Sequence, residues 1–241
     1  MNTTFEKATQ RTVAPFRHDI VGSFLRPAAL KEARLKFQAG EITAEQLRIV
    51  EDQEITKLVQ KQKEVGLKGV TDGEFRRSWW HLDFFWGFDG VERQVLEKGY
   101  NFHGGLTRAE TSVLTGKIKY TSHPHIEHFK FLKSVAGDDV LPRQNIPSPA
   151  QFLQELKREE NREAVKTIYP DTNELLADLA AAYNKCILDF YEAGCRNLQV
   201  DDCTWGALCD PRIQEGLAKE GIDFKEVLRV NAELNNKALE N

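Results

Sequence analysis

The sequence lacks any apolar run of the roughly 18–20 residues that a membrane-spanning helix needs. Its most apolar segment, residues 79–88, is interrupted by His81 and Asp83. Residues 1–11 are polar and contain no signal-peptide run. Basic and acidic side chains nearly balance, at 33 and 37, and the Lys and Arg residues form no run, which disfavours nucleic acid and membrane surfaces as partners. We therefore expect a cytoplasmic protein.

Cysteine is scarce, and its spacing has no recognised pattern. The four cysteines form no Cys-x-x-Cys pair, and in the absence of a secretion signal we expect reduced thiols. Cys203 and Cys209 are expected to be buried structural thiols. The sequence also has no glycine-rich phosphate loop, no nucleophile elbow and no His-Glu-x-x-His motif. It therefore carries none of the common signatures of phosphate binding, serine hydrolysis or zinc proteolysis.

Two clusters of aromatic or imidazole side chains have a structural and a functional interpretation. His123, His125 and His128 have spacings that metal ligands can show, but no cysteine or carboxylate cluster accompanies them, so a metal site is not expected there. The tryptophans and phenylalanines of residues 79–86 suit either a pocket for a planar ligand or the core of their own segment. The core is the favoured interpretation.

The composition is typical of a globular protein, with 41% apolar and 29% charged residues over 241 positions. That length suits one large domain or two small ones. Residues 1–17 are expected to be an irregular lead-in, and residues 79–134 an excursion without clean periodicity. We expect strands at 18–24, 69–70, 117–120, 140–146 and 197–202, and helices beginning near 27, 44, 150, 172 and 224. This order favours an α/β fold with a parallel sheet covered by helices.

Polar side chains follow the predicted strands directly, at Ser23, Asp72, Glu74, Ser148 and Asp201. Barrel enzymes and open α/β sheets both bind their ligands at the carboxyl ends of strands. About four βα units can be counted, whereas a closed barrel needs eight. The sheet is therefore either open or the front part of a longer protein.

Glu74 and Asp201 are the leading candidates for chemistry. Carboxylates at neighbouring strand ends can bind an ammonium group, act as acid and base, or hold a metal. The alternative is that they cap a helix or pair with an arginine, and Arg76 and Arg77 are close by in sequence. Residues 21–23 (Val-Gly-Ser) offer backbone donors and a hydroxyl for a substrate carboxylate, although from these residues alone a plain turn is favoured.

Three motifs in order, residues 19–24 (DIVGSF), 72–80 (DGEFRRSWW) and 198–202 (LQVDD), resemble the cobalamin-independent methionine synthase family. The resemblance is closest to the catalytic barrel of its shorter, single-barrel bacterial members, and it extends from about residue 15 to the end. It implies a (β/α)8 TIM-barrel fold, of which residues 18–241 would form the N-terminal part, with roughly the first four βα units and the excursion after the second strand.

The resemblance also implies an activity. Members of the family transfer a methyl group from 5-methyltetrahydrofolate to the zinc-activated thiol of homocysteine and so form methionine. By resemblance, Val21, Gly22 and Ser23 receive the homocysteine carboxylate, while Glu74 and Asp201 bind its amino group. The protein would thus be an enzyme similar to 5-methyltetrahydropteroyltriglutamate–homocysteine S-methyltransferase, acting on a small thiol and a methyl donor. A homo-oligomer is compatible with this interpretation.

The sequence departs from the family pattern at several points. Asp202 and Cys203 stand where the family has Glu-Pro, and the folate-side motif is matched only loosely at residues 147–150. The methyl donor could therefore be a methylated corrinoid protein or a small methylated thiol. The family's zinc ligands, beginning with a His-x-Cys pair, would lie beyond Asn241. We therefore expect no metal site in this chain, which alone would be inactive.

Three other functions remain open at the level of the sequence. The first is zinc-dependent alkyl transfer to a different thiol, such as coenzyme M. The second is general acid–base chemistry on a glycosidic bond between Glu74 and Asp201. The third is a non-catalytic fragment or binding module that lacks the metal site.

Overall fold

The computed structural model describes residues 13–16, 20–97, 101–102, 105–106 and 109–240, and the chain divides into two compact units. Unit 1 comprises the described residues up to Arg76 together with 129–144 and 195–198. Unit 2 comprises 77–128, 145–194 and 199–241. In the described residues, no helix is both long and apolar enough to cross a membrane.

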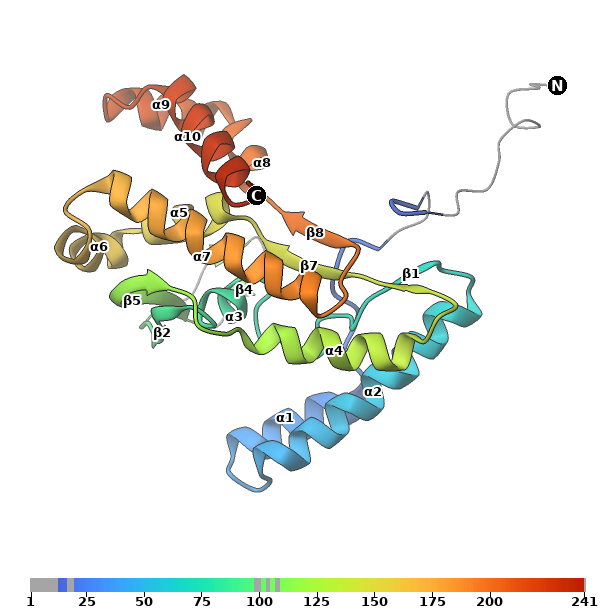
Figure 1. The fold of residues 1–241 in the computed structure, drawn as a ribbon. Coiled ribbons are helices and arrows are strands. Elements are labelled where there is room, and N and C mark those ends of the chain that lie inside the picture. The colour runs from blue at the N-terminus through green and yellow to red at the C-terminus, as the bar shows by residue number, and fades with distance from the viewer. Residues whose placement is uncertain (1–12, 17–19, 98–100, 103–104, 107–108, 241) are drawn as a thin grey trace. The chain divides into compact units, whose positions relative to one another are not determined.

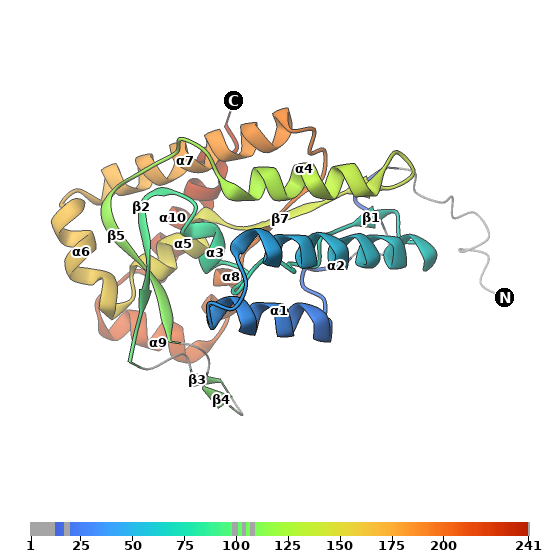
Figure 2. The ribbon, with the colours of Figure 1, turned by 90° about the horizontal axis from the view of Figure 1, so that it is seen from below.

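A helical hairpin dominates unit 1. Helix α1 (Ala28–Gln38) and helix α2 (Ala44–Glu64) lie side by side in both Figure 1 and Figure 2. The predicted capping box begins α2: the Thr43 hydroxyl accepts from the Gln46 N–H at 3.2 Å, and the Gln46 side chain accepts from the Thr43 N–H at 2.8 Å. Gly66, with φ of 87°, follows the helix as expected.

A short parallel strand pair completes the regular structure of unit 1. Strand β1 (Gly69–Val70) pairs with strand β6 (Leu141–Pro142), so that Gly69 lies opposite Leu141. The first predicted strand, 18–24, is wrong for its described part, because residues 20–24 adopt no regular structure; positions 18 and 19 lie outside the described residues. Val21 and Leu25 are 79% and 94% exposed, so this segment has no buried apolar face that would hold it in a sheet.

The excursion after the second predicted strand contains an ordered hairpin in unit 2. Strand β2 (Asp89–Val95) pairs antiparallel with strand β5 (Glu110–Lys119), which contains most of the strand expected at 117–120. Between them, β3 (Asn101–Phe102) pairs with β4 (Gly105–Leu106). Helix α3 (Leu82–Phe85) precedes the hairpin.

The remaining elements lie mostly in unit 2. Strand β7 (Gln144–Pro147) pairs with strand β8 (Leu198–Asp201), and just beyond β7 the Ser148 N–H donates to the Asp201 carbonyl at 2.8 Å. The helices are α4 (Pro124–Ala136), α5 (Pro149–Leu156), α6 (Arg162–Ile168), α7 (Thr172–Glu192), α8 (Thr204–Leu208), α9 (Pro211–Lys219) and α10 (Phe224–Lys237), with a 3-10 turn at Glu159–Asn161. Helices α5, α7 and α10 were expected; α6, α8 and α9 were not.

The core of unit 2 is aromatic. Phe85 stacks on Phe152 of α5 with ring centroids 4.2 Å apart, and Phe84 lies 5.6 Å from Tyr183 of α7. All four rings are fully buried. For the phenylalanines of residues 79–86, the expected core role is therefore confirmed.

The α/β class expected from the sequence is confirmed. Among the described residues the strands pair two by two, as β1–β6, β2–β5, β3–β4 and β7–β8. The eight-unit barrel and the single-domain boundaries 18–241 stay predictions.

Candidate substrate-binding site

The turn that follows β1, residues 71–76, carries Glu74 and is called the Glu74 loop below. Gln62 of α2 fixes its start, because the Gln62 side chain donates to the Thr71 carbonyl at 2.8 Å and accepts from the Thr71 N–H at 3.0 Å. Gly73 and Glu74 both have left-handed backbone, with φ of 64° and 59°. Glycine adopts this conformation readily, whereas a glutamate is strained there. Asp72 supports the strained residue by accepting from the Glu74 N–H at 2.9 Å.

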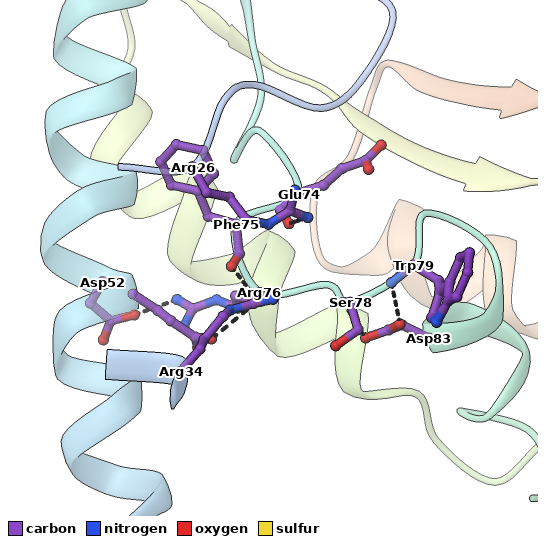
Figure 3. Close-up of polar contacts among 10 residues, drawn as sticks. Arg26, Arg34, Asp52, Glu74, Phe75, Arg76, Ser78, Trp79 and Asp83 are labelled. Carbon is purple, nitrogen blue, oxygen red and sulfur yellow. Dashed lines mark hydrogen bonds and ion pairs between the residues drawn. The ribbon is translucent and has the colours of Figure 1, made fainter. Parts of the chain in front are cut away.

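Three consecutive carbonyl groups of the loop are bound from the segment 24–34 of the same unit. The Phe24 N–H donates to the Gly73 carbonyl at 3.1 Å. Arg26 donates to the Glu74 carbonyl at 3.0 Å, and Arg34 donates to the Phe75 carbonyl at 2.5 Å. Figure 3 shows both guanidinium groups directed at the loop. The backbone around Glu74 is therefore fixed by contacts from residues more than forty positions away in the sequence.

Arg76 has partners other than Glu74. It bonds to Glu51 at 3.1 Å and forms an ion pair with Asp52, both on α2, and it lies over the Phe131 ring at 5.1 Å. Burial raises the pKa of Glu51, although the neighbouring arginines oppose the shift. In Figure 3 the Glu74 carboxylate points away from the Arg76–Asp52 pair. Arg76 thus ties the Glu74 loop to α2.

The segment predicted to receive a substrate carboxylate lies beside this loop. Val21 and Ser23 are exposed, and Phe24, the next residue along the chain, makes the main-chain bond to Gly73. Four of the five predicted site residues (21, 22, 23 and 74) therefore belong to unit 1, on two segments that the structure brings together.

Asp201, the fifth predicted residue, belongs to unit 2 and ends β8. Gln199 donates to one of its carboxylate oxygens at 2.6 Å, and Asn145 donates to the other at 3.2 Å. Arg77 in turn binds both the carbonyl and the side-chain oxygen of Asn145, at 2.7 and 3.1 Å. Asp201 is half-buried, and both of its carboxylate oxygens accept from neutral amides. The sequence did not predict a role for Asn145, because it belongs to none of the motifs. Its contact with Asp201 follows from its position on β7, which pairs with β8.

Asp202 and Cys203 have separate roles from Asp201. Asp202 accepts from the Thr204 N–H at 3.0 Å at the start of α8 and from Asn235 of α10 at 2.8 Å, so it is a structural residue. The expectation that Cys203 and Cys209 are buried is wrong, because both are exposed. Partial burial and the neighbouring Asp201 and Asp202 raise the pKa of the Cys203 thiol, which therefore stays protonated at neutral pH.

The histidine cluster is built into the core of unit 2. His123 Nε2–H donates to the Phe84 carbonyl at 2.9 Å, and His123 Nδ1 accepts from the His125 N–H at 3.1 Å. Burial lowers the pKa of His123 to about 4 and places the pKa of His125 well below its usual range. In the part of the chain that the structure describes, no group of three or more His, Cys, Asp or Glu side chains could hold a metal ion. The described residues therefore do not fit a zinc site.

No family model matches the chain. The Bacillus subtilis protein YxjH, which is named as uncharacterized, is 45% identical over 99% of this chain and 61% of its own length. The 5-methyltetrahydropteroyltriglutamate–homocysteine methyltransferase of Thermosynechococcus vestitus is 25% identical over 92% of this chain and 27% of its own length. The chain thus spans about three fifths of the length of the curated relative YxjH.

Two solved structures are also similar. A Listeria monocytogenes protein, provisionally named a vitamin B12-independent methionine synthase, is 43% identical, with a TM-score of 0.74 over 95% of this chain and 62% of its own. A B12-independent methionine synthase from Shewanella, solved in complex with selenomethionine, shares the fold at 18% identity, with a TM-score of 0.58 over 83% of this chain and 51% of its own. These findings confirm the resemblance that the three motifs indicated: the chain is a homologue of the cobalamin-independent methionine synthases.

Proposed function

We propose that this protein takes part in methyl transfer to homocysteine, and that the described residues supply recognition of the amino acid. The observation that carries the proposal is the Glu74 loop. A glutamate held in left-handed backbone is costly, and such strain concentrates at functional sites. Bonds to the three consecutive carbonyls of residues 73–75 then offset that cost.

The chemistry of the residues agrees with an α-amino acid ligand. Glu74 and Asp201 each carry a carboxylate, the kind of group that binds an ammonium group, and ion-paired hydrogen bonds to carboxylate are among the stronger polar contacts. Val21, Gly22 and Ser23 would provide backbone N–H groups and a hydroxyl for the ligand's carboxylate. Homocysteine and methionine share both groups, so the same residues would bind substrate and product.

The names of the relatives support the acceptor and the type of donor. The Thermosynechococcus relative is named for a pteroyltriglutamate methyl donor and homocysteine, and the Shewanella structure holds selenomethionine, which has the shape of the product. The methyl-folate donor and the homocysteine acceptor are therefore proposed here for this protein.

Kinetics of the full-length natural protein test this proposal. Methionine formation from homocysteine and 5-methyltetrahydrofolate is measured for the wild type, Glu74→Gln and Asp201→Asn. Each substitution removes one charge opposite the ammonium group, so the homocysteine KM should rise by about 10-fold to 100-fold, as expected for loss of a charged hydrogen bond.

Glu45→Gln is the matched control, because Glu45 is an exposed carboxylate on α2. Its KM should equal that of the wild type. The proposal is wrong if the wild type forms no methionine from homocysteine, or if the Glu74 and Asp201 variants keep the wild-type KM.

A further inference from the structure

We propose that Arg34 is a positioning residue for amino-group recognition: it holds the Glu74 loop in the conformation that aims the Glu74 carboxylate at an α-ammonium group. This inference rests on the proposed function, since it assigns a residue to the same site. Arg34 does not belong to any of the three motifs that carry the family resemblance.

The loop needs an external support because its conformation is unfavourable. Glu74 has φ of 59°, and its predecessor Gly73 has φ of 64°. The left-handed backbone at position 73 favours glycine, and a Cβ atom there would also lie 2.4 Å from Cδ2 of Leu58. Because residue 73 is glycine, its left-handed backbone costs little conformational energy, but the strain at Glu74 remains. Contacts elsewhere must therefore offset that strain.

Arg34 supplies a strong contact directly after the strained residue. Its guanidinium donates to the Phe75 carbonyl at 2.5 Å, while Arg26 holds the Glu74 carbonyl at 3.0 Å (Figure 3). Hydrogen bonds from a charged donor are stronger than those between neutral groups. The Arg26 bond holds the peptide group between Glu74 and Phe75, and the Arg34 bond holds the next one, between Phe75 and Arg76. Neither peptide group can rotate back to ordinary backbone without losing a hydrogen bond from a charged donor.

Arg34 itself is held in place by the charges of α2. Its guanidinium lies 3.7 Å from Glu51, which also accepts from Arg76 at 3.1 Å. The Arg34 side chain is 17% exposed and that of Arg76 is 5% exposed, so water screens these contacts weakly. The Glu51 carboxylate thus contacts both Arg34 and Arg76, the last residue of the Glu74 loop.

This arrangement predicts a specific pattern of loss. Without Arg34, residues 74 and 75 can relax toward right-handed backbone, and the Glu74 carboxylate turns away from its ligand. Ligands with an α-amino group should therefore bind more weakly, whereas ligands that lack it should bind as before.

Calorimetric titration of the full-length natural protein tests this pattern with two stable probes, L-methionine and its des-amino analogue 4-(methylthio)butanoate. In Arg34→Met the Kd for L-methionine should rise at least about tenfold, while the Kd for the analogue should change less than about twofold. Arg34→Lys, which keeps one cationic donor, should recover part of the preference. Arg48→Met, an exposed arginine on α2, is the matched control and should leave both constants unchanged.

Other outcomes separate the two proposals. Equal weakening of both probes, or no weakening, in Arg34→Met overturns the positioning role. If the wild type itself does not prefer L-methionine to the analogue, or if Glu74→Gln leaves that preference intact, the proposed function is the one that fails. If Arg34→Met does not fold, Arg26→Met removes the neighbouring donor and is judged by the same ratio of constants.

Discussion

The contact between Gly87 and His123 shows how a single hydrogen atom can be required at one position. A Cβ atom at residue 87 would lie 2.2 Å from Nε2 of His123 and 2.6 Å from its Cδ2. The ring cannot swing aside, because both of its nitrogens are hydrogen-bonded, to the Phe84 carbonyl and the His125 N–H. Close packing of this kind leaves no room for a methyl group.

Gly87→Ala should therefore destabilise the protein by about 1–3 kcal/mol, as overpacking of a core does. Urea unfolding followed by circular dichroism measures the loss. Gly116→Ala is the control, since a Cβ there would meet only the Gly90 Cα at 3.9 Å, and its unfolding free energy should stay within about 0.5 kcal/mol of the wild type. Equal stability of the two variants would contradict the steric argument.

At the residue scale, the sequence predicts Glu74 but not what supports it. The motif 72–80 points to a carboxylate after a strand, and the structure places Glu74 there, buried in a turn. Arg26 and Arg34 lie 48 and 41 positions from their partners in the loop. No local pattern encodes contacts over such separations, so the left-handed backbone and its arginines appear only in the structure.

Helix ends are the elements that local sequence predicts best. The reciprocal bonds of Thr43 and Gln46, and the Asp171 side chain that accepts from the Asn173 N–H at 2.9 Å, are both made within a few residues. Such contacts form whatever the rest of the chain does, because they satisfy N–H groups that every helix start leaves open.

Thr43→Ala should consequently lower the free energy of unfolding by about 1 kcal/mol, through loss of the cap of α2. Thr56→Ala, in the exposed interior of the same helix, removes only a bond to the Asp52 carbonyl and should change stability by less than about 0.5 kcal/mol. Thermal unfolding of both variants measures the difference, and a loss in Thr56→Ala as large as that in Thr43→Ala would refute the capping argument.

Strands were predicted less well, for two physical reasons. Strand β5 buries Glu110, Thr111 and Ser112, and this polar start hides the alternation that marks a strand. Thr111 is satisfied by a 2.6 Å bond to Glu155 of α5, which no local pattern reveals. The segment 18–24 shows the opposite error, since apolar character suggested a strand that the described residues do not form.

At the scale of the whole molecule, buried neutral histidines set the response to acid. Burial lowers the pKa values of His81 and His123 to about 4, from 6.5 in an unfolded chain. The folded state therefore binds fewer protons than the unfolded state between these values. The resulting stability is fully present above about pH 6.5 and is lost as the pH falls toward 4.

Each of the two histidines should thus cost up to about 3 kcal/mol of unfolding free energy between pH 6.5 and pH 4. Urea unfolding across this range measures the slope for the wild type and for His123→Asn. In the variant, the slope of unfolding free energy against pH should be smaller by the equivalent of up to about one bound proton. This difference is expected whatever the stability of the variant at neutral pH. Identical slopes would show that His123 is not kept neutral by the fold.

The resemblance carried by the three motifs, and confirmed by the relatives, indicates homology to the cobalamin-independent methionine synthases, which the strand predictions alone could not indicate. Motifs report the residues that a function requires, whereas strand pairing depends on partners far away in the chain. The pairing of β7 with β8 joins residues separated by more than fifty positions. The α/β class followed from periodicity, but the pairing of individual strands did not.

The two hydrogen bonds between Gln62 and Thr71 limit which mutations position 62 can tolerate. A side chain that matches a peptide group must present one donor and one acceptor side by side, and only glutamine and asparagine do so. The asparagine side chain is one methylene shorter, so its amide group would lie too far from Thr71 to make the two bonds. Every single-nucleotide change of a glutamine codon that alters the residue gives Lys, Glu, Pro, Leu, Arg, His or a stop. Every single-nucleotide missense change of the Gln62 codon therefore removes the amide group that makes both bonds to Thr71, and with it the support at the start of the Glu74 loop.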